Sequence, residues 1–129
     1  YIEIELTETV DEEEAGLLID FMNKMRKYNI LMTIDDFGTG YSSLNMLRSF
    51  PVDVLKIDKS LVSSMEESAQ IILSNVVRMA SELKMDVVAE GVETEEQYHY
   101  LKNSGCDVIQ GYYFSKPISK EDYYQKYYA

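Results

Sequence analysis

The alternation of apolar and polar residues along this chain predicts five strands, each followed by a helix. The strand-like runs lie at residues 2–6, 30–35, 54–58, 86–91 and 107–114. Helical spacing of apolar residues predicts helices over roughly 12–28, 42–49 and 66–84, another that begins after Thr94 and a last one after Ser119. Short connections between such units indicate a parallel sheet with helices outside it. The residues alone leave open whether the sheet is doubly wound or forms a (β/α) barrel.

Two of the predicted helices have distinctive sequences. Thr94 and Gln97 have the spacing of a capping box, which favours a helix start at this point. The last helix is rich in Tyr over residues 123–128. We expect these rings to pack in a core or against a partner rather than to bind a ligand.

Composition limits the class of protein. A chain of 129 residues has the normal size of one domain. Its 23 acidic residues against 12 basic ones give a net charge of -11, which argues against a broad contact with a nucleic acid polymer. Cys106 is the single cysteine, so we expect no internal disulfide, no Cys/His zinc cluster and a reducing, cytoplasmic setting. No apolar run has the length of a membrane span, so we expect no membrane contact by this segment.

Polar residues collect where each predicted strand ends. The residues at these ends are Glu5, Asp35, Asp36, Lys56, Asp58, Glu90 and Gln110. In parallel α/β folds, active sites lie at the C-terminal ends of the strands. A single acid at such a place is more often an exposed carboxylate or a helix cap. The agreement of five strands favours a common site.

Alternation along the third predicted strand sharpens this interpretation. Lys56 and Asp58 share one face of the strand, while Leu55 and Ile57 share the opposite, apolar face that packs on helices. The polar face then points towards the mouth of a barrel. Glu3 also points inward, one layer below the acid that ends the first strand, and the sequence shows no partner for it.

Carboxylates crowded in this way need a counter-charge, because two charges at contact range in a partly buried site repel by about 4 kcal/mol. Mg²⁺ or Mn²⁺ with oxygen ligands would supply it. Asp35 and Asp36 would reach two metals where the chain turns at Gly38 and Gly40. A paired-metal site suits phosphodiester hydrolysis, with Lys56 orienting water or neutralising the phosphate. A metal-dependent barrel acting on phosphorylated sugars would use the same carboxylates.

Five blocks of sequence carry a family resemblance. They are "ELTET", "DDFGTGYSSL", "LKIDKSLV", "VVAEGVET" and "QGYYFSKPI", in that order. Together they resemble the C-terminal part of the EAL domain, the cyclic di-GMP phosphodiesterase family of bacterial signalling. The resemblance implies a TIM-type parallel (β/α) barrel, present here as a partial barrel of about five strand–helix units. Residues 1–129 would form the C-terminal portion of a single EAL-type domain.

The resemblance also implies a reaction and a set of site residues. The family hydrolyses cyclic di-GMP to linear pGpG with two Mg²⁺ or Mn²⁺ ions. By resemblance, the metal ligands are Glu5, Asp35, Asp36 and Glu90. The catalytic residues are Lys56, Glu90 and Asp35, with Lys56 at the catalytic water. The residues near the substrate or behind these ligands are Glu8, Asp58, Glu93 and Gln110.

The chain departs from the family pattern at its start. The Glu-Ala-Leu tripeptide and an Asn metal ligand precede "ELTE" in family members, so both would lie before Tyr1. We therefore expect a truncated barrel whose missing portion comes from another chain, through a homodimer or another pairing, or was removed from a longer protein. Such a chain would be inactive alone or would be active only with that portion. The alternative is a non-catalytic cyclic di-GMP receptor or protein-interaction module.

Overall fold

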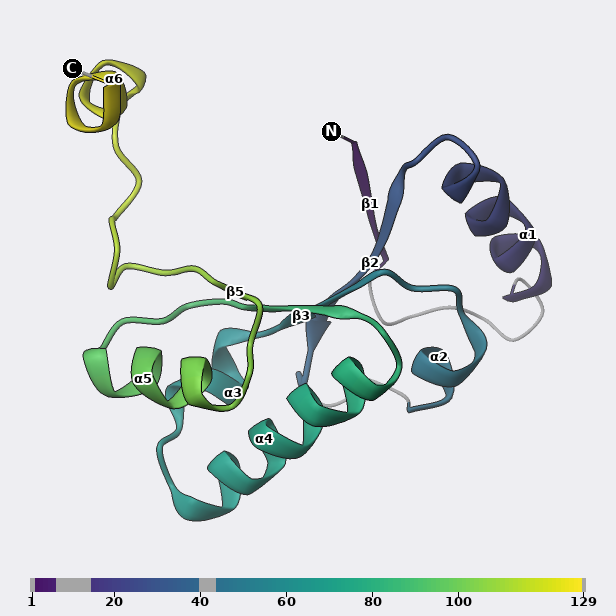
Figure 1. Ribbon diagram of the computed structural model, residues 1–129, viewed down its shortest axis with the longest axis horizontal. Helices are drawn as coiled ribbons and strands as arrows, with labels where there is room; N and C mark the ends of the chain where they lie inside the picture. Colours follow the sequence, from purple (N-terminus) through teal and green to yellow (C-terminus); the bar gives the residue numbers. More distant parts are fainter. Residues whose placement is uncertain (1, 7–14, 40–43, 129) are drawn as a thin grey trace.

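The computed structural model describes residues 2–6, 15–39 and 44–128, which form a five-stranded parallel sheet with helices (Figure 1). The strands are β1 (Glu3–Leu6), β2 (Leu31–Phe37), β3 (Val54–Ile57), β4 (Asp86–Ala89) and β5 (Val108–Ile109). The helices are α1 (Ala15–Arg26), α2 (Leu44–Ser49), α3 (Lys59–Ser63), α4 (Glu67–Glu82), α5 (Glu95–Asn103) and α6 (Lys120–Tyr128). None of the helices in the described part of the chain has the length and apolar character needed to cross a bilayer.

The strand order decides between the two sheet architectures that the sequence leaves open. Each strand pairs in parallel with the next one along the chain, so the order is β1-β2-β3-β4-β5. A doubly wound sheet reverses its order where its second half begins, and this sheet has no such reversal. A consecutive order is that of a (β/α) barrel, which has eight strands when complete. The described residues therefore form part of a barrel.

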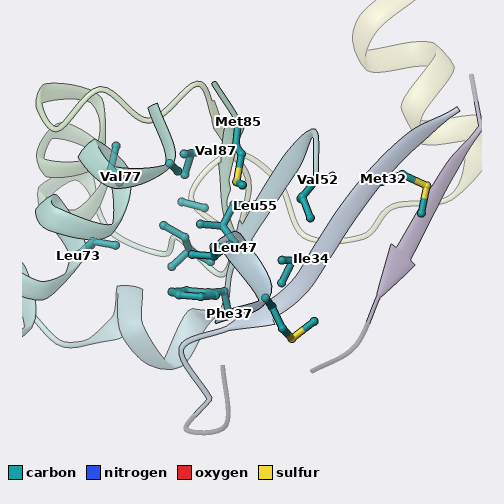
Figure 2. Close-up of a cluster of buried hydrophobic side chains, with 14 of the residues drawn as sticks. Met32, Ile34, Phe37, Leu47, Val52, Leu55, Leu73, Val77, Met85 and Val87 are labelled. Atoms are coloured by element: carbon teal, nitrogen blue, oxygen red, sulfur yellow. The ribbon is translucent and has the colours of Figure 1, made fainter. Parts of the chain in front are cut away.

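The core lies between the sheet and the helices. Leu55 and Ile57 of β3 are fully buried, as the predicted alternation requires, and Val87 of the neighbouring β4 is buried as well. Figure 2 shows Leu73 and Val77 of α4 facing Leu55 and Val87. Burial of side chains of this size is the main source of stability, at roughly 1.5–3 kcal/mol each. It also fixes the register of β3, and with it the direction in which the polar side chains of that strand point.

The fifth strand is shorter than predicted. Strand character was expected over 107–114, whereas β5 ends at Ile109 and residues 111–114 form a turn. The cause is a close approach at Gly111, where an added Cβ would lie 2.1 Å from the carbonyl oxygen of Val92. The amide of Phe114 then donates to the carbonyl oxygen of Gly111 at 3.1 Å. Contact with a distant segment therefore overrides the local preference for an extended chain.

Two further differences occur around β2 and β3. The second strand continues beyond its predicted end at residue 35 to Phe37, with an irregular register between Ile34 and Phe37. The helix α3 follows β3 directly, although none was predicted between 58 and 66. Asp58 caps it by accepting a hydrogen bond from the amide of Ser60 at 2.8 Å. Hydrogen bonds from Ser60 also hold the pKa of the Asp58 carboxyl below its usual value of 3.8.

The tyrosines of α6 are exposed, so these rings do not pack in the core of the described part of the chain. Figure 1 shows α6 standing apart from the other helices, at the end of an extended segment after β5. Its rings contact one another instead, with centroids of Tyr123 and Tyr127 5.0 Å apart and those of Tyr124 and Tyr128 5.6 Å apart. Docking of this helix against a partner stays a prediction.

The capping box at the start of α5 is confirmed, and it holds the segment that follows β4. The hydroxyl of Thr94 accepts a hydrogen bond from the amide of Gln97 at 3.2 Å. The Oε1 atom of Gln97 accepts from the amides of Glu93 at 2.8 Å and Thr94 at 3.1 Å. Gln97 is itself buried. This side chain therefore ties residues 93–94 to α5.

We predict that Gln97→Leu lowers the free energy of unfolding by about 2 kcal/mol, because two backbone amides lose their acceptor. Urea denaturation at neutral pH measures the change. Gln97→Glu is the matched control, since a carboxylate at this position of a capping box accepts from the same amides. If the Glu variant lost as much stability as the Leu variant, the packing of the side chain rather than its hydrogen bonds would be the cause.

We predict that Asp58→Ala costs about 1 kcal/mol of stability at pH 7, the usual value for an N-cap residue. The folded-state pKa of Asp58 is lowered, so its contribution is present above the unfolded-state value of 3.8 and disappears as the pH falls through the folded-state pKa. Urea denaturation from pH 7 to pH 3 should show the difference from wild type shrinking below that value. Asp58→Asn should keep the cap at both ends of the range; a loss at pH 7 equal to that of the Ala variant would contradict the capping role.

Candidate functional site

Three carboxylates from three strands meet at the ammonium group of Lys56. The Nζ atom of Lys56, on β3, lies 2.9 Å from Oε1 of Glu5 on β1 and 3.0 Å from Oδ1 of Asp35 on β2. It also lies 3.0 Å from Oε1 of Glu90, the residue that directly follows β4. Parallel register aligns the C-terminal ends of these strands, so side chains far apart in the sequence reach one point. The structure thus brings together four of the predicted site residues.

The carboxylate cluster, as we call Glu5, Asp35 and Glu90, is open on one side. The side chains of Asp35 and Glu90 are 18% and 24% exposed, whereas that of Glu5 is 47% exposed. Lys56 is the least exposed of the four at 17%. Burial acts to lower the pKa of Lys56, but hydrogen bonds to the three carboxylates outweigh it and raise that pKa well above its ordinary value. The ammonium group therefore stays charged at neutral pH.

The cluster keeps an excess of negative charge that suits a cation. Three carboxylates and one ammonium leave a local charge of about −2. Oδ1 of Asp35 is buried, and the contact that it makes is the ion pair with Lys56 at 3.0 Å. Carboxylate oxygens are the ligands that hard divalent ions take. The donor atoms of the cluster are therefore of the type that a divalent ion binds.

The three carboxylates converge on Lys56 rather than on an open position. Within residues 2–6, 15–39 and 44–128, no three acidic, His or Cys side chains already surround a common metal position. The carboxylates of Glu5, Asp35 and Glu90 point instead at Nζ of Lys56. A divalent ion at this place would have to share or take over these oxygens.

Asp36 differs from its neighbour Asp35. It has a φ of +56°, an uncommon backbone conformation for a residue other than Gly, and it is exposed. It lies within the irregular part of the β2–β3 ladder, between Ile34 and Phe37. The strict alternation of a strand is thus interrupted at this residue. Glu8, predicted to act behind the metal ligands, lies outside the described residues.

Gln110 and Glu93 lie beside the cluster. The Nε2 atom of Gln110 donates a hydrogen bond of 2.8 Å to Oε1 of Glu90, which orients that carboxylate. Glu90, Glu93 and Gln110 line an open cavity of about 910 Å³, whose other walls include Lys59, Tyr112, residues 115–120 and the α6 residues Tyr123 and Tyr127. Ligand sites are commonly about 300–1,000 Å³, so the cavity has room for a nucleotide. Asp58, in contrast, serves as the cap of α3, and its contact with a substrate stays a prediction.

Sequence reasoning missed two positions that shape the site. The buried hydroxyl of Thr33 donates to Oε1 of Glu3, which is the partner that the sequence did not reveal. Gly91 has a φ of +70°, and a Cβ there would lie 2.3 Å from Cβ of Lys59, so the chain after Glu90 passes closely beside α3. A glycine directly after an acid at a strand end was the available signal for the second position.

Comparison with known proteins relates this geometry to a family. The EAL domain family model matches residues 1–117. The protein named cyclic di-GMP phosphodiesterase NbdA, from Pseudomonas aeruginosa, is 39% identical over 120 residues, which are 92% of this chain and 15% of that protein. The crystal structure of an EAL domain protein from Listeria monocytogenes is 38% identical with a TM-score of 0.84, covering 97% of this chain and 50% of that one.

A third relative was solved with ligands. The manganese/cy-diGMP complex of BlrP1 from Klebsiella pneumoniae is 37% identical with a TM-score of 0.76, covering 89% of this chain and 30% of that one. The chain spans less than a fifth of the length of NbdA and at most half of these solved chains. Its five-stranded sheet is part of the TIM-barrel-like fold of the EAL domain structures. The chain belongs to the EAL domain family.

Proposed function

We propose that residues 1–129 are the C-terminal portion of a single EAL-type domain that hydrolyses cyclic di-GMP in the cytoplasm. The observation that carries this proposal is the convergence of Glu5, Asp35 and Glu90 on Lys56 at the C-terminal edge of the sheet. The name of NbdA supports the substrate class and the reaction type. The complex of BlrP1 with manganese and cyclic di-GMP supports a metal-dependent site of this kind.

Two Mg²⁺ or Mn²⁺ ions would complete the site, held by Glu5, Asp35, Asp36 and Glu90. The excess negative charge of the cluster and the buried oxygen of Asp35 support this assignment. The chemistry that such ions supply is a water nucleophile at neutral pH and stabilisation of the leaving oxygen. The hydrogen bond from Gln110 would fix the orientation of the Glu90 carboxylate.

Lys56 would act on the phosphate and the attacking water. Its side chain is mostly buried and positively charged, so it would stabilise the negative charge that develops on the phosphoryl oxygens. The cavity beside Glu90 would hold the nucleotide, with Lys59 and Tyr112 on its wall. The reaction consumes one water, forms one P–O bond and breaks another, and the proton passes to the leaving oxygen. The product is linear pGpG.

The purified chain, incubated with cyclic di-GMP and Mn²⁺, tests the proposal when pGpG is followed by chromatography. We predict that Asp35→Asn reduces both Mn²⁺ affinity and hydrolysis by roughly a hundredfold or more, because a metal ligand is lost. Isothermal titration with Mn²⁺ measures the first effect and the chromatographic assay the second.

Asp86→Asn is the matched control. Asp86 is an exposed aspartate that begins β4, so it lies at the edge of the sheet opposite to the site. This variant should keep wild-type activity. Normal turnover by Asp35→Asn would refute the metal assignment. Tight binding of cyclic di-GMP without turnover by the wild-type chain would favour the non-catalytic receptor instead.

A further inference from the structure

Lys56 occupies the point at which the carboxylate cluster converges, and this placement has a consequence for metal binding. We propose that Lys56 is an exchangeable counter-cation: its ammonium group holds Glu5, Asp35 and Glu90 together in the metal-free chain, and it must give up these contacts when a divalent ion binds. Besides its proposed role at the phosphate and the attacking water, Lys56 would thus set the metal affinity of the site. The inference rests on the metal site of the proposed function.

The N–H donors of the ammonium group match the carboxylates of the cluster in number and in position. An ammonium has three N–H donors, and three carboxylates lie 2.9–3.0 Å from Nζ. With Lys56 removed, their negative charges would repel one another across a partly buried site. The side chains of Leu55 and Ile57 are fully buried on the opposite face of β3. The backbone of β3 therefore holds Lys56 on the side of the sheet that faces the carboxylates.

A divalent ion and the ammonium group cannot occupy this point together. Mg²⁺ binds carboxylate oxygens at about 2.0–2.1 Å, which is much closer than the ion pairs of Lys56. Both cations also repel each other at contact range. The long, flexible side chain of Lys56 can move, whereas Glu90 is held by Gln110 and Asp35 by its strand. Exchange would therefore displace Lys56 and leave the carboxylates in place.

The three contacts of Lys56 are not equivalent. Oδ1 of Asp35 is buried, whereas the side chain of Glu5 is 47% exposed. Glu5 is the most exposed of the cluster, so its side is open for the approach of an ion and the departure of the ammonium group.

We predict that Lys56→Met lowers the melting temperature of the metal-free chain and raises its affinity for Mn²⁺. The metal-free variant should melt several degrees below wild type, because the carboxylates lose their counter-charge. Its Mn²⁺ affinity should rise by roughly tenfold, because the ion no longer displaces an ammonium group and also relieves the repulsion among the carboxylates. Thermal melting without metal and isothermal titration with MnCl₂ measure the two effects on the 129-residue chain.

Two controls separate this role from a general effect of charge. Lys24→Met removes the same charge from the last turn of α1, away from the cluster, and should leave Mn²⁺ affinity unchanged. Lys56→Arg keeps the charge and should not bind Mn²⁺ more tightly than wild type. Equal or weaker Mn²⁺ binding by Lys56→Met than by wild type overturns the inference, as does no binding by either protein.

A measurement on the wild-type chain tests the inference even where the Lys56→Met variant fails to fold. With ¹⁵N-labelled lysine, the side-chain ammonium signal of Lys56 should shift as Mg²⁺ is added, while that of Lys24 stays in place. An unchanged Lys56 signal at saturating Mg²⁺ overturns the inference. None of these readouts uses turnover, so failure of the metal exchange and failure of the proposed activity are distinguished.

Discussion

The arrangement of this chain depends on one electrostatic balance, the neutralisation of three carboxylates by Lys56 at the edge of the sheet. The three like charges would otherwise repel one another at this edge. Packing of the core fixes the position of Lys56, because Leu55 and Ile57 are buried on the opposite face of the same strand. A slip of one residue in β3 would place the lysine in the core and an isoleucine among the carboxylates, so packing and charge select the same register.

The sequence was sufficient to predict the polar edge of the sheet because that prediction needs only the strand period. Alternation along β3 placed Lys56 on one face, and parallel strands bring their C-terminal ends to one edge. Asp35 and Glu90 could then be assigned to the same point without knowing any distance. The capping box at Thr94 was equally local, since it lies within four residues of one helix end. Strand periodicity and helix caps can be predicted from the sequence because they depend on residues that are close together along the chain.

The features that the sequence did not reveal depend on contacts between distant segments. Strand β5 ends early because Gly111 lies against Val92, and the pattern of residues 107–114 contains no sign of that approach. The hydrogen bond from Thr33 to Glu3 likewise joins two strands whose register is a property of the folded sheet. The tyrosines of α6 are exposed because the extended segment after β5 places this helix apart from the other helices. The spacing of the tyrosines in the sequence does not reveal that placement.

The carboxylates of the adjacent residues Asp35 and Asp36 are kept in different environments by the backbone and by the charge of Lys56. Asp35 continues the regular strand and directs a buried oxygen at Lys56, whereas Asp36 takes a φ of +56° and is exposed. The two carboxylates thus enter different environments although they are neighbours in the sequence. One is held by the lysine and the other is in reach of solvent, so the repulsion between them is reduced before any metal binds.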